Sequence, residues 1–177
     1  MISVAVEAVV IRPMQSADLE QVLAIDQVSF AMPWPVSAYR FELNENPSSQ
    51  LWVAETQPTE GSPAIVGMSV VWLILDEAHI ATIAVHPDHR GQGIAQSLMQ
   101  ATLAGAIRRG CTQATLEVRE GNLAAQRLYH RFGFQLVGIR PHYYRDNNED
   151  AWIMTVADMG PGYRSWLENG GWRTPPE

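Results

Sequence analysis

The stretch 82-TIAVHPDHRGQGIA-95 decides the fold of this chain. Its β-rich start runs from Thr82 to Val85, two closely spaced glycines follow, and a helical apolar pattern begins at Ile94. The first turn of a helix carries unpaired N–H groups and a partial positive charge, and glycine lets the backbone approach a ligand closely. The loop is therefore predicted to bind an anionic group, with a plain glycine turn at a helix start as the alternative.

Two common nucleotide-binding patterns do not match this loop. No Gly-Lys-Ser/Thr sequence follows the glycines, as a P-loop would need, and the third glycine of the dinucleotide-binding fingerprint is absent. Apolar or small residues at positions 94, 98, 101 and 105 share one face, which predicts a helix to about residue 109. Gly110 is suited to end that helix in a left-handed conformation.

Hydrophobic periodicity divides the rest of the chain into strands and helices. Strands are predicted at residues 6–12, 51–55, 65–75, 78–85, 114–118, 134–140 and 151–156, and helices at 16–30, 37–43, 94–109 and 122–132. Consecutive strands permit hairpins, whereas the β-α-β part of this order requires a crossover to a parallel strand. The prediction is an α/β fold with a mixed central sheet of about seven strands flanked by about four helices.

Composition indicates one acidic domain with enough apolar material for a core. The chain has 177 residues, 46% of them hydrophobic, and a formal net charge of −7. Such a chain lacks the broad positive field that non-specific nucleic-acid binding requires. Its single cysteine, Cys111, excludes an intrachain disulfide, and a cytoplasmic location is expected. Nowhere do about 18 apolar residues run together, so no membrane span is predicted.

One folded domain is expected to occupy residues 8–157, where the periodic elements lie. The apolar run at residues 1–10 lacks a basic start and indicates a first strand rather than a signal peptide. Residues 158–177 are rich in glycine and proline and are expected to form a C-terminal tail that is at best partly ordered. Trp166 and Trp172 in this tail are candidates for packing on the domain or contacting a partner.

The loop Arg90-Gly91-Gln92-Gly93-Ile94-Ala95 resembles the Q/R-x-x-G-x-G/A signature of the GCN5-related N-acetyltransferase (GNAT) superfamily. The resemblance implies the GNAT fold, with acetyl-CoA as co-substrate and no metal. In that family the loop holds the pyrophosphate, and the free edge of the preceding strand pairs with the pantetheine amides. Ala95 departs from the commoner final glycine, a change that the family tolerates. The cofactor-binding residues implied are Ile83, Ala84, Val85, Arg90, Gly91, Gln92, Gly93, Ile94, Ala95, Gln96 and Asn122.

Further blocks resemble the RimI-type subfamily, whose members acetylate the N-terminal alanine of small-subunit ribosomal protein eighteen. They are LEVREGN at 116–122, AAQRLYHRFGF at 124–134, and stretches at 25–34 and 138–154, so the resemblance covers about residues 10–156. It implies a protein N-terminus as substrate, that of a ribosomal protein. It also implies no direct contact with nucleic acid or membrane, and a monomeric or weakly dimeric enzyme. The base and the acid of this subfamily match Glu117 and Tyr129.

The residues themselves support an acyl transfer to an amine. An α-amine has a pKa of about 7.7–8.0 and must lose a proton before it attacks a thioester. Glu117, near the end of a predicted central strand, is the candidate base, and the backbone N–H of Val85 is a candidate donor to the oxyanion. Tyr129 is the candidate acid for the thiolate. The alternatives are a surface-facing Glu117 and a Tyr129 that is part of the core.

Aromatic residues in two loops complete the predicted site. Trp34, Tyr143 and Tyr144 lie in segments that flank the acceptor side in the family, and they are the candidate substrate-binding residues. Ordinary anchoring of these loops is the alternative. Nearby acidic residues, Asp26 and the pair at 149–150, either attract a cationic amine or are solvated surface charges. No metal is expected, because the histidines of the turn at 86–89 have no third ligand in pattern.

Two other functions compete with N-terminal acetylation. One is a GNAT enzyme that acetylates lysine side chains or a small-molecule amine. The other is a non-catalytic module that binds acetyl-CoA without transferring the acetyl group. The pair Glu117 and Tyr129 and the loop from Phe30 to Trp34 argue against the first alternative. The intact glycine loop together with both candidate catalytic residues argues against the second.

Overall fold

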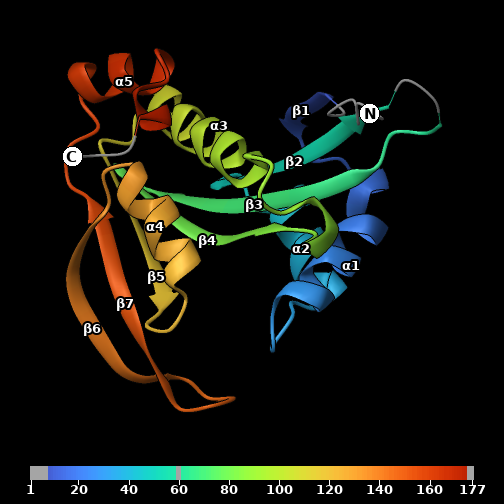
Figure 1. The fold of residues 1–177 in the computed structure, drawn as a ribbon, viewed down its shortest axis with the longest axis horizontal. Coiled ribbons are helices and arrows are strands. Elements are labelled where there is room, and N and C mark those ends of the chain that lie inside the picture. Colours follow the sequence, from blue (N-terminus) through green and yellow to red (C-terminus); the bar gives the residue numbers. More distant parts are fainter. Residues whose placement is uncertain (1–7, 59–60, 175–177) are drawn as a thin grey trace, which may run out of the picture.

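The computed structural model describes residues 8–58 and 61–174, which form a seven-stranded sheet with helices on both faces (Figure 1). The strands are β1 (Ala8–Pro13), β2 (Ser49–Gln57), β3 (Ile65–Ile74), β4 (Glu77–Val85), β5 (Gln113–Arg119), β6 (Gln135–Tyr144) and β7 (Glu149–Val156). The helices are α1 (Leu19–Ser29), α2 (Val36–Asn44), α3 (Ile94–Arg108), α4 (Leu123–Arg131) and α5 (Pro161–Glu168). Short 3-10 turns lie at Ser16–Asp18, Pro87–His89 and Gly171–Arg173.

The sheet is mixed, as the element order predicted. Its strand order is β1-β2-β3-β4-β5-β7-β6, and only the pair β4–β5 is parallel. That pair is short, because residues 77–79 of β4 match residues 113–115 of β5 and the strands then diverge. Beyond residue 79, no strand among the described residues pairs with the edge of β4 that faces β5. This confirms the expected free strand edge before the glycine loop.

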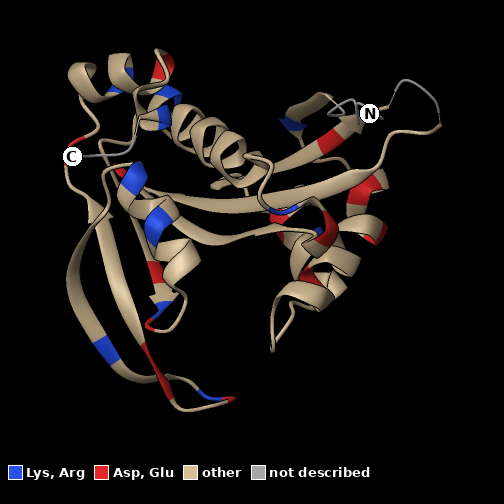
Figure 2. Ribbon diagram, viewed as in Figure 1, with Lys and Arg blue, Asp and Glu red and all other residues tan. Residues whose placement is uncertain are grey.

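The central strands are buried on both faces, and strand alternation distributes their side chains between two helix layers. Residues 65–71 of β3 are all buried, and β3 carries no charged residue (Figure 2). On one face Met68 packs with Val22 of α1 and Tyr39 of α2. On the other face the hydroxyl of the next residue, Ser69, hydrogen-bonds the Thr102 hydroxyl of α3 at 2.7 Å. The sheet thus places α1 and α2 opposite α3, and the glycine loop starts the helix that covers the second face.

The segment after residue 157 differs from the predicted tail. It forms α5 and a 3-10 turn, and Leu167 and Trp172 belong to the main hydrophobic cluster. The Trp172 ring stacks on Phe132 with 5.3 Å between centroids, and the Tyr163 hydroxyl donates to the Phe132 carbonyl at 2.7 Å. Five α-helices therefore flank the sheet instead of about four.

The composition of this segment was misleading because its glycines and prolines delimit a helix. Pro161 occupies the first turn of α5, where its missing N–H is not needed. Gly170 follows the helix with φ of 72°, a left-handed conformation that glycine adopts easily. Residues 175–177, with the last two prolines, and residues 1–7, which include the start of the first predicted strand, lie outside the described residues.

Candidate active site

The loop between β4 and α3 presents backbone N–H groups without a capping side chain. Gly91 and Gly93 have φ of 75° and 80°, a conformation that side chains other than glycine rarely adopt. Gly93 is the N-cap of α3, and no side chain accepts a hydrogen bond from the first turn. Arg90 ties the loop back to the strand, because its Nε donates to the Val85 carbonyl at 3.0 Å. The start of α3 is therefore open to an anion.

A cavity of about 560 Å³ lies between the end of β4, the start of α3 and one face of α4. Ten of the eleven residues expected to bind the cofactor line it, and only Gln92 is absent from its wall. The ten are Ile83, Ala84, Val85, Arg90, Gly91, Gly93, Ile94, Ala95, Gln96 and Asn122. Residues that are up to 39 positions apart in the chain, from Ile83 to Asn122, thus surround one cavity.

Two further arginines of the cavity wall were not predicted. Arg127 and Arg131 are four residues apart on α4, so they project from the same face of the helix toward the cavity. With Arg90 they place three arginines in a wall that contains no aspartate or glutamate. The cavity is thus cationic in a chain of net charge −7. The four-residue spacing of these two arginines on the predicted helix was the sequence feature that could have placed them on one face together.

Asn122 and Tyr129 belong to the same helix. The Asn122 side chain accepts a hydrogen bond from the Ala125 N–H at 3.1 Å, which confirms the predicted helix cap. Tyr129 lines the cavity with 7% of its surface exposed. Burial, and to a lesser extent the neighbouring Tyr144, raises the pKa of Tyr129. The phenol is therefore protonated at neutral pH and can donate a proton or hydrogen bond into the cavity.

Glu117 lies on β5 outside the cavity wall, in an ion-paired environment. Its side chain is 13% exposed, so it is not the freely solvated residue that the alternative interpretation described. His79 Nε2 lies 3.0 Å from Glu117 Oε2, and an Arg140 nitrogen lies 3.4 Å from Oε1. The hydrogen bond with His79 and, to a smaller extent, the charges of both partners lower the pKa of Glu117 against the opposing effect of burial.

His79 had no role in the sequence interpretation. A histidine within an apolar strand gives no distinctive signal, and only the pairing of β4 with β5 brings it to Glu117. Its ring also stacks on Trp72 of β3, with 5.5 Å between centroids. His79 is thus held by two contacts, a polar one with Glu117 and a stacking one with Trp72.

Trp34 lies in the segment between α1 and α2 and is packed against other aromatic residues. Its ring centroid is 6.0 Å from that of Trp72 and 5.3 Å from that of Tyr39. Its backbone N–H donates to Asp26 Oδ2 at 2.6 Å. Asp26 is only 1% exposed, so it holds this loop and is not a solvated surface charge. Burial raises the pKa of Asp26.

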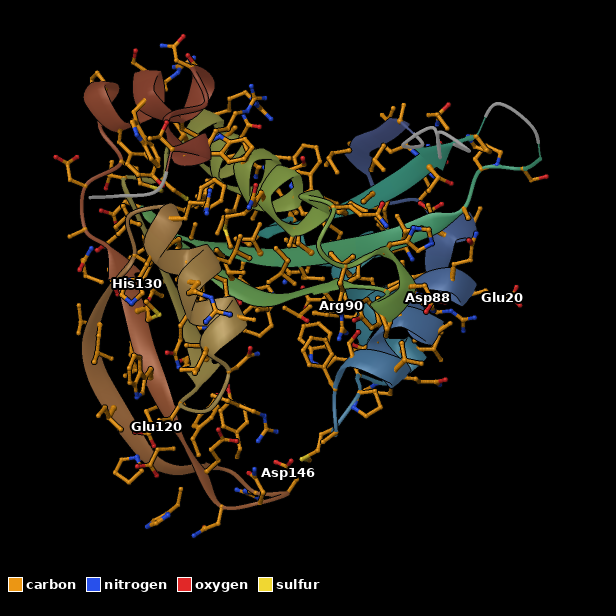
Figure 3. All side chains as sticks on the ribbon, viewed as in Figure 1. Glu20, Asp88, Arg90, Glu120, His130 and Asp146 are labelled. Carbon is orange, nitrogen blue, oxygen red and sulfur yellow. The ribbon has the colours of Figure 1, made fainter. Side chains whose placement is uncertain are left out.

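Tyr143 and Tyr144 lie at the end of β6. Their rings meet edge to face with 5.2 Å between centroids. Burial raises the pKa of Tyr144 to about 12, and the carboxylate of Glu117 contributes to that rise. Figure 3 shows Arg90 near the centre of the molecule and Asp146 at the tip of the hairpin that follows Tyr144. Tyr144 is thus in electrostatic range of Tyr129 and Glu117, and Trp34 is linked to Glu117 through the rings of Trp72 and His79.

Comparison with known proteins assigns this arrangement to a family. The Acetyltransferase (GNAT) family matches residues 19–134, which contain the glycine loop, Glu117 and Tyr129. The chain belongs to the GNAT family of acetyltransferases. Its seven-stranded sheet with flanking helices is the GNAT fold, and the chain is an N-acetyltransferase.

Relatives within the GNAT family align with most of the chain. A Bacillus subtilis (strain 168) protein provisionally named ribosomal protein bS18-alanine N-acetyltransferase is 37% identical over 146 residues, which are 82% of this chain and 93% of the relative. The ribosomal protein bS18-alanine N-acetyltransferase of Escherichia coli (strain K12) is 31% identical over 148 residues, 82% of this chain and 95% of the relative. The crystal structure of the Escherichia coli ribosomal-protein-S18-alanine N-acetyltransferase covers 84% of this chain and 93% of its own, with a TM-score of 0.74 and 30% identity.

Within residues 8–58 and 61–174 no three histidine, cysteine, aspartate or glutamate side chains gather as ligands of one metal ion. His86 and His89 lie edge to face with 6.1 Å between ring centroids. None of the helices in that part of the chain is long and apolar enough to span a bilayer.

Proposed function

We propose that this GNAT enzyme transfers the acetyl group of acetyl-CoA to the α-amine of a protein N-terminus, the N-terminal alanine of small-subunit ribosomal protein eighteen being the intended substrate. The observation that carries the proposal is the likeness to two bacterial bS18-alanine N-acetyltransferases over 82% of the chain, a span that includes the site. A ribosomal substrate would place the activity in the cytoplasm.

The cationic cavity is proposed to hold the phosphates of acetyl-CoA. The pyrophosphate would accept hydrogen bonds from the open N–H groups between Gly91 and Ile94, supported by the positive end of α3. Arg127 and Arg131 supply further charge for the phosphates. The pantetheine arm would lie along the free edge of β4, where its amides can pair with strand N–H and C=O groups.

Strand alternation supports the proposed oxyanion donor. The His86 N–H bonds to the Val66 carbonyl on β3, so the preceding residue, Val85, directs its N–H to the opposite side, the free edge. The Val85 carbonyl on that same side is already occupied by Arg90. A thioester carbonyl at the end of the pantetheine arm would therefore meet the Val85 N–H.

The proposed reaction is direct transfer. The lone pair of the amine attacks the thioester carbonyl carbon, and the resulting tetrahedral intermediate collapses by breaking the carbon–sulfur bond. The amine loses its proton to Glu117, directly or through water, and Tyr129 supplies a proton to the departing thiolate. His79 keeps the Glu117 carboxylate ionised and oriented. Trp34, Tyr143 and Tyr144 are proposed to surround the acceptor N-terminus.

Mass spectrometry of peptide acetylation tests the proposal. An alanine-initiated peptide incubated with enzyme and acetyl-CoA should gain one acetyl group at its α-amine. A matched peptide with a blocked N-terminus and free lysines should remain unmodified. Acetylation of the lysines or of a polyamine instead would favour the alternative acceptors. Tight acetyl-CoA binding without transfer to any amine would indicate a binding module.

A further inference from the structure

The side chain of Arg119, the last residue of β5, contacts three residues at the tip of the β6–β7 hairpin. Its guanidinium nitrogens lie 2.8 Å from Asp146 Oδ1 and 3.1 Å from Glu149 Oε2. The guanidinium carbon lies 3.9 Å from the centroid of the Tyr144 ring, in a stacked cation–π contact.

The hairpin is also attached to the turn that follows Arg119. Glu149 Oε1 accepts a hydrogen bond from the Gly121 N–H at 2.8 Å, and the Glu120 N–H donates to the Asp150 carbonyl at 3.1 Å. A Cβ atom on Gly121 would lie 2.9 Å from Glu149 Oε1, so glycine allows this close approach. Figure 3 shows Glu120 and Asp146 at the same end of the molecule.

The same turn forms part of the cofactor side. Gln126 of α4 donates from Nε2 to the Arg119 carbonyl at 3.1 Å and to the Glu120 carbonyl at 2.7 Å. Asn122, which ends the turn, caps α4 and lines the cationic cavity. The turn at residues 119–122 is therefore shared by the acetyl-CoA cavity on one side and by the Tyr144-bearing hairpin on the other.

The β-ladder alone does not fix Tyr144. The pairing of β6 with β7 is irregular between Arg140 and Tyr144, and the next pair joins Tyr144 to Glu149. Within that irregular stretch His142 has φ of 54°, and Asn148 across the hairpin has φ of 59°. Side-chain contacts therefore help to set the ring position, namely the stack on Arg119 and the edge-to-face contact with Tyr143.

Tyr144 lies where a positioned ring matters for the reaction. Tyr144 contributes to the raised pKa of Tyr129, and the carboxylate of Glu117 contributes to that of Tyr144. Its hydroxyl therefore lies within electrostatic range of both proposed catalytic groups. Arginine suits this task because one planar group can stack on an aromatic face and bind carboxylates with its edge. Partly exposed ion pairs contribute little stability singly, so the contacts matter mainly as geometry.

We infer that Arg119 is a positioning residue, which holds Tyr144 against the acceptor N-terminus and thereby sets the affinity for the peptide substrate. The inference rests on the proposed function, because it needs a peptide acceptor. It assigns Arg119 no contact with the reacting atoms.

Steady-state kinetics of Arg119→Met with an alanine-initiated peptide tests the inference. The KM for the peptide should rise roughly tenfold, whereas the KM for acetyl-CoA should change by less than about twofold. Arg119→Lys keeps the charge but loses the planar stack, so it should recover only part of the peptide affinity. Arg164→Met is the control, because Arg164 pairs with Glu168 on the exposed face of α5, and it should leave both constants unchanged.

A double-mutant cycle separates positioning from general support of the fold. Once Tyr144→Leu has removed the ring, Arg119→Met should add little to the peptide KM. Fully additive effects, an unchanged peptide KM in active Arg119→Met, or an equal rise in the acetyl-CoA KM would overturn the inference. If Arg119→Met does not fold, Arg119→Lys carries the same cycle. A wild-type enzyme that acetylates no peptide N-terminus would instead overturn the proposed function.

Discussion

His79 Nε2 lies 3.0 Å from Glu117 Oε2, and the two residues sit at the fork where β4 and β5 part. His79 is the last residue of β4 that is paired with β5, opposite Thr115, and Glu117 lies two residues farther along β5. This contact therefore marks the point at which strand pairing ends and the free edge of β4 begins.

Glu117→Gln should slow turnover by about 10²–10⁴-fold, because the amide keeps the shape of the side chain but cannot accept the amine proton. Binding of acetyl-CoA should be unchanged, since Glu117 does not line the cavity. Single-turnover acetylation of an alanine-initiated peptide measures the first effect and calorimetry the second. An unaltered rate would remove Glu117 from the mechanism.

His79→Phe should move the acidic limb of the pH–rate profile to higher pH. The hydrogen bond from His79 is the largest cause of the lowered pKa of Glu117, so its loss raises that pKa and the ionised base then requires a higher pH. Phenylalanine retains the aromatic contact with Trp72. Arg140→Gln should produce a smaller shift, because Arg140 is 54% exposed and its contact is 3.4 Å. An acidic limb that stays in place would show that Glu117 does not set it.

Gly93→Glu should abolish acetyl-CoA binding, because it introduces a side chain at φ of 80° and a negative charge beside the phosphates. Gly110→Glu is a matched control, since Gly110 has φ of 93° at the other end of α3 and is not part of the cavity wall. The control should lose stability to a similar extent and keep its affinity. Calorimetry on both variants provides the comparison, and normal binding by Gly93→Glu would refute the phosphate assignment.

Arg127→Met should weaken acetyl-CoA binding by roughly tenfold, in accord with the loss of one charge-assisted contact to a phosphate. The dependence of affinity on salt concentration should become shallower, because one cation fewer faces the ligand. Titration calorimetry at two ionic strengths measures both quantities. Equal affinity at low salt would place the phosphates elsewhere.

Trp172→Ala should lower the free energy of unfolding by about 3–5 kcal/mol, the usual cost of removing a buried tryptophan. Trp172 stacks on Phe132 at the end of α4, so the loss would also loosen the helix that carries Tyr129. Val137→Ala, on the exposed outer strand, should cost little. Urea denaturation of both variants tests this, and equal stabilities would mean that the C-terminal segment contributes little to the domain.

Much of the architecture was predictable because local patterns report local geometry. The two glycines between Val85 and Ile94 allow left-handed backbone at a helix start, and their spacing is visible in the sequence. The alternation and spacing of apolar residues likewise indicated all seven strands and the mixed sheet. The glycine and proline content, in contrast, led to the wrong prediction of a partly ordered tail after residue 157. The same residue types occur both at helix ends and in flexible tails.

Side-chain partnerships depended on the tertiary structure. Histidine at position 79 and glutamate at 117 become a pair only because β4 lies beside β5 and the two strands then separate. Likewise Arg119 meets Tyr144 because β7 is inserted between β5 and β6 in the sheet, and the hairpin then turns back to the end of β5. Periodicity shows which face of an element is buried, but strand order and register determine which distant side chain lies opposite it.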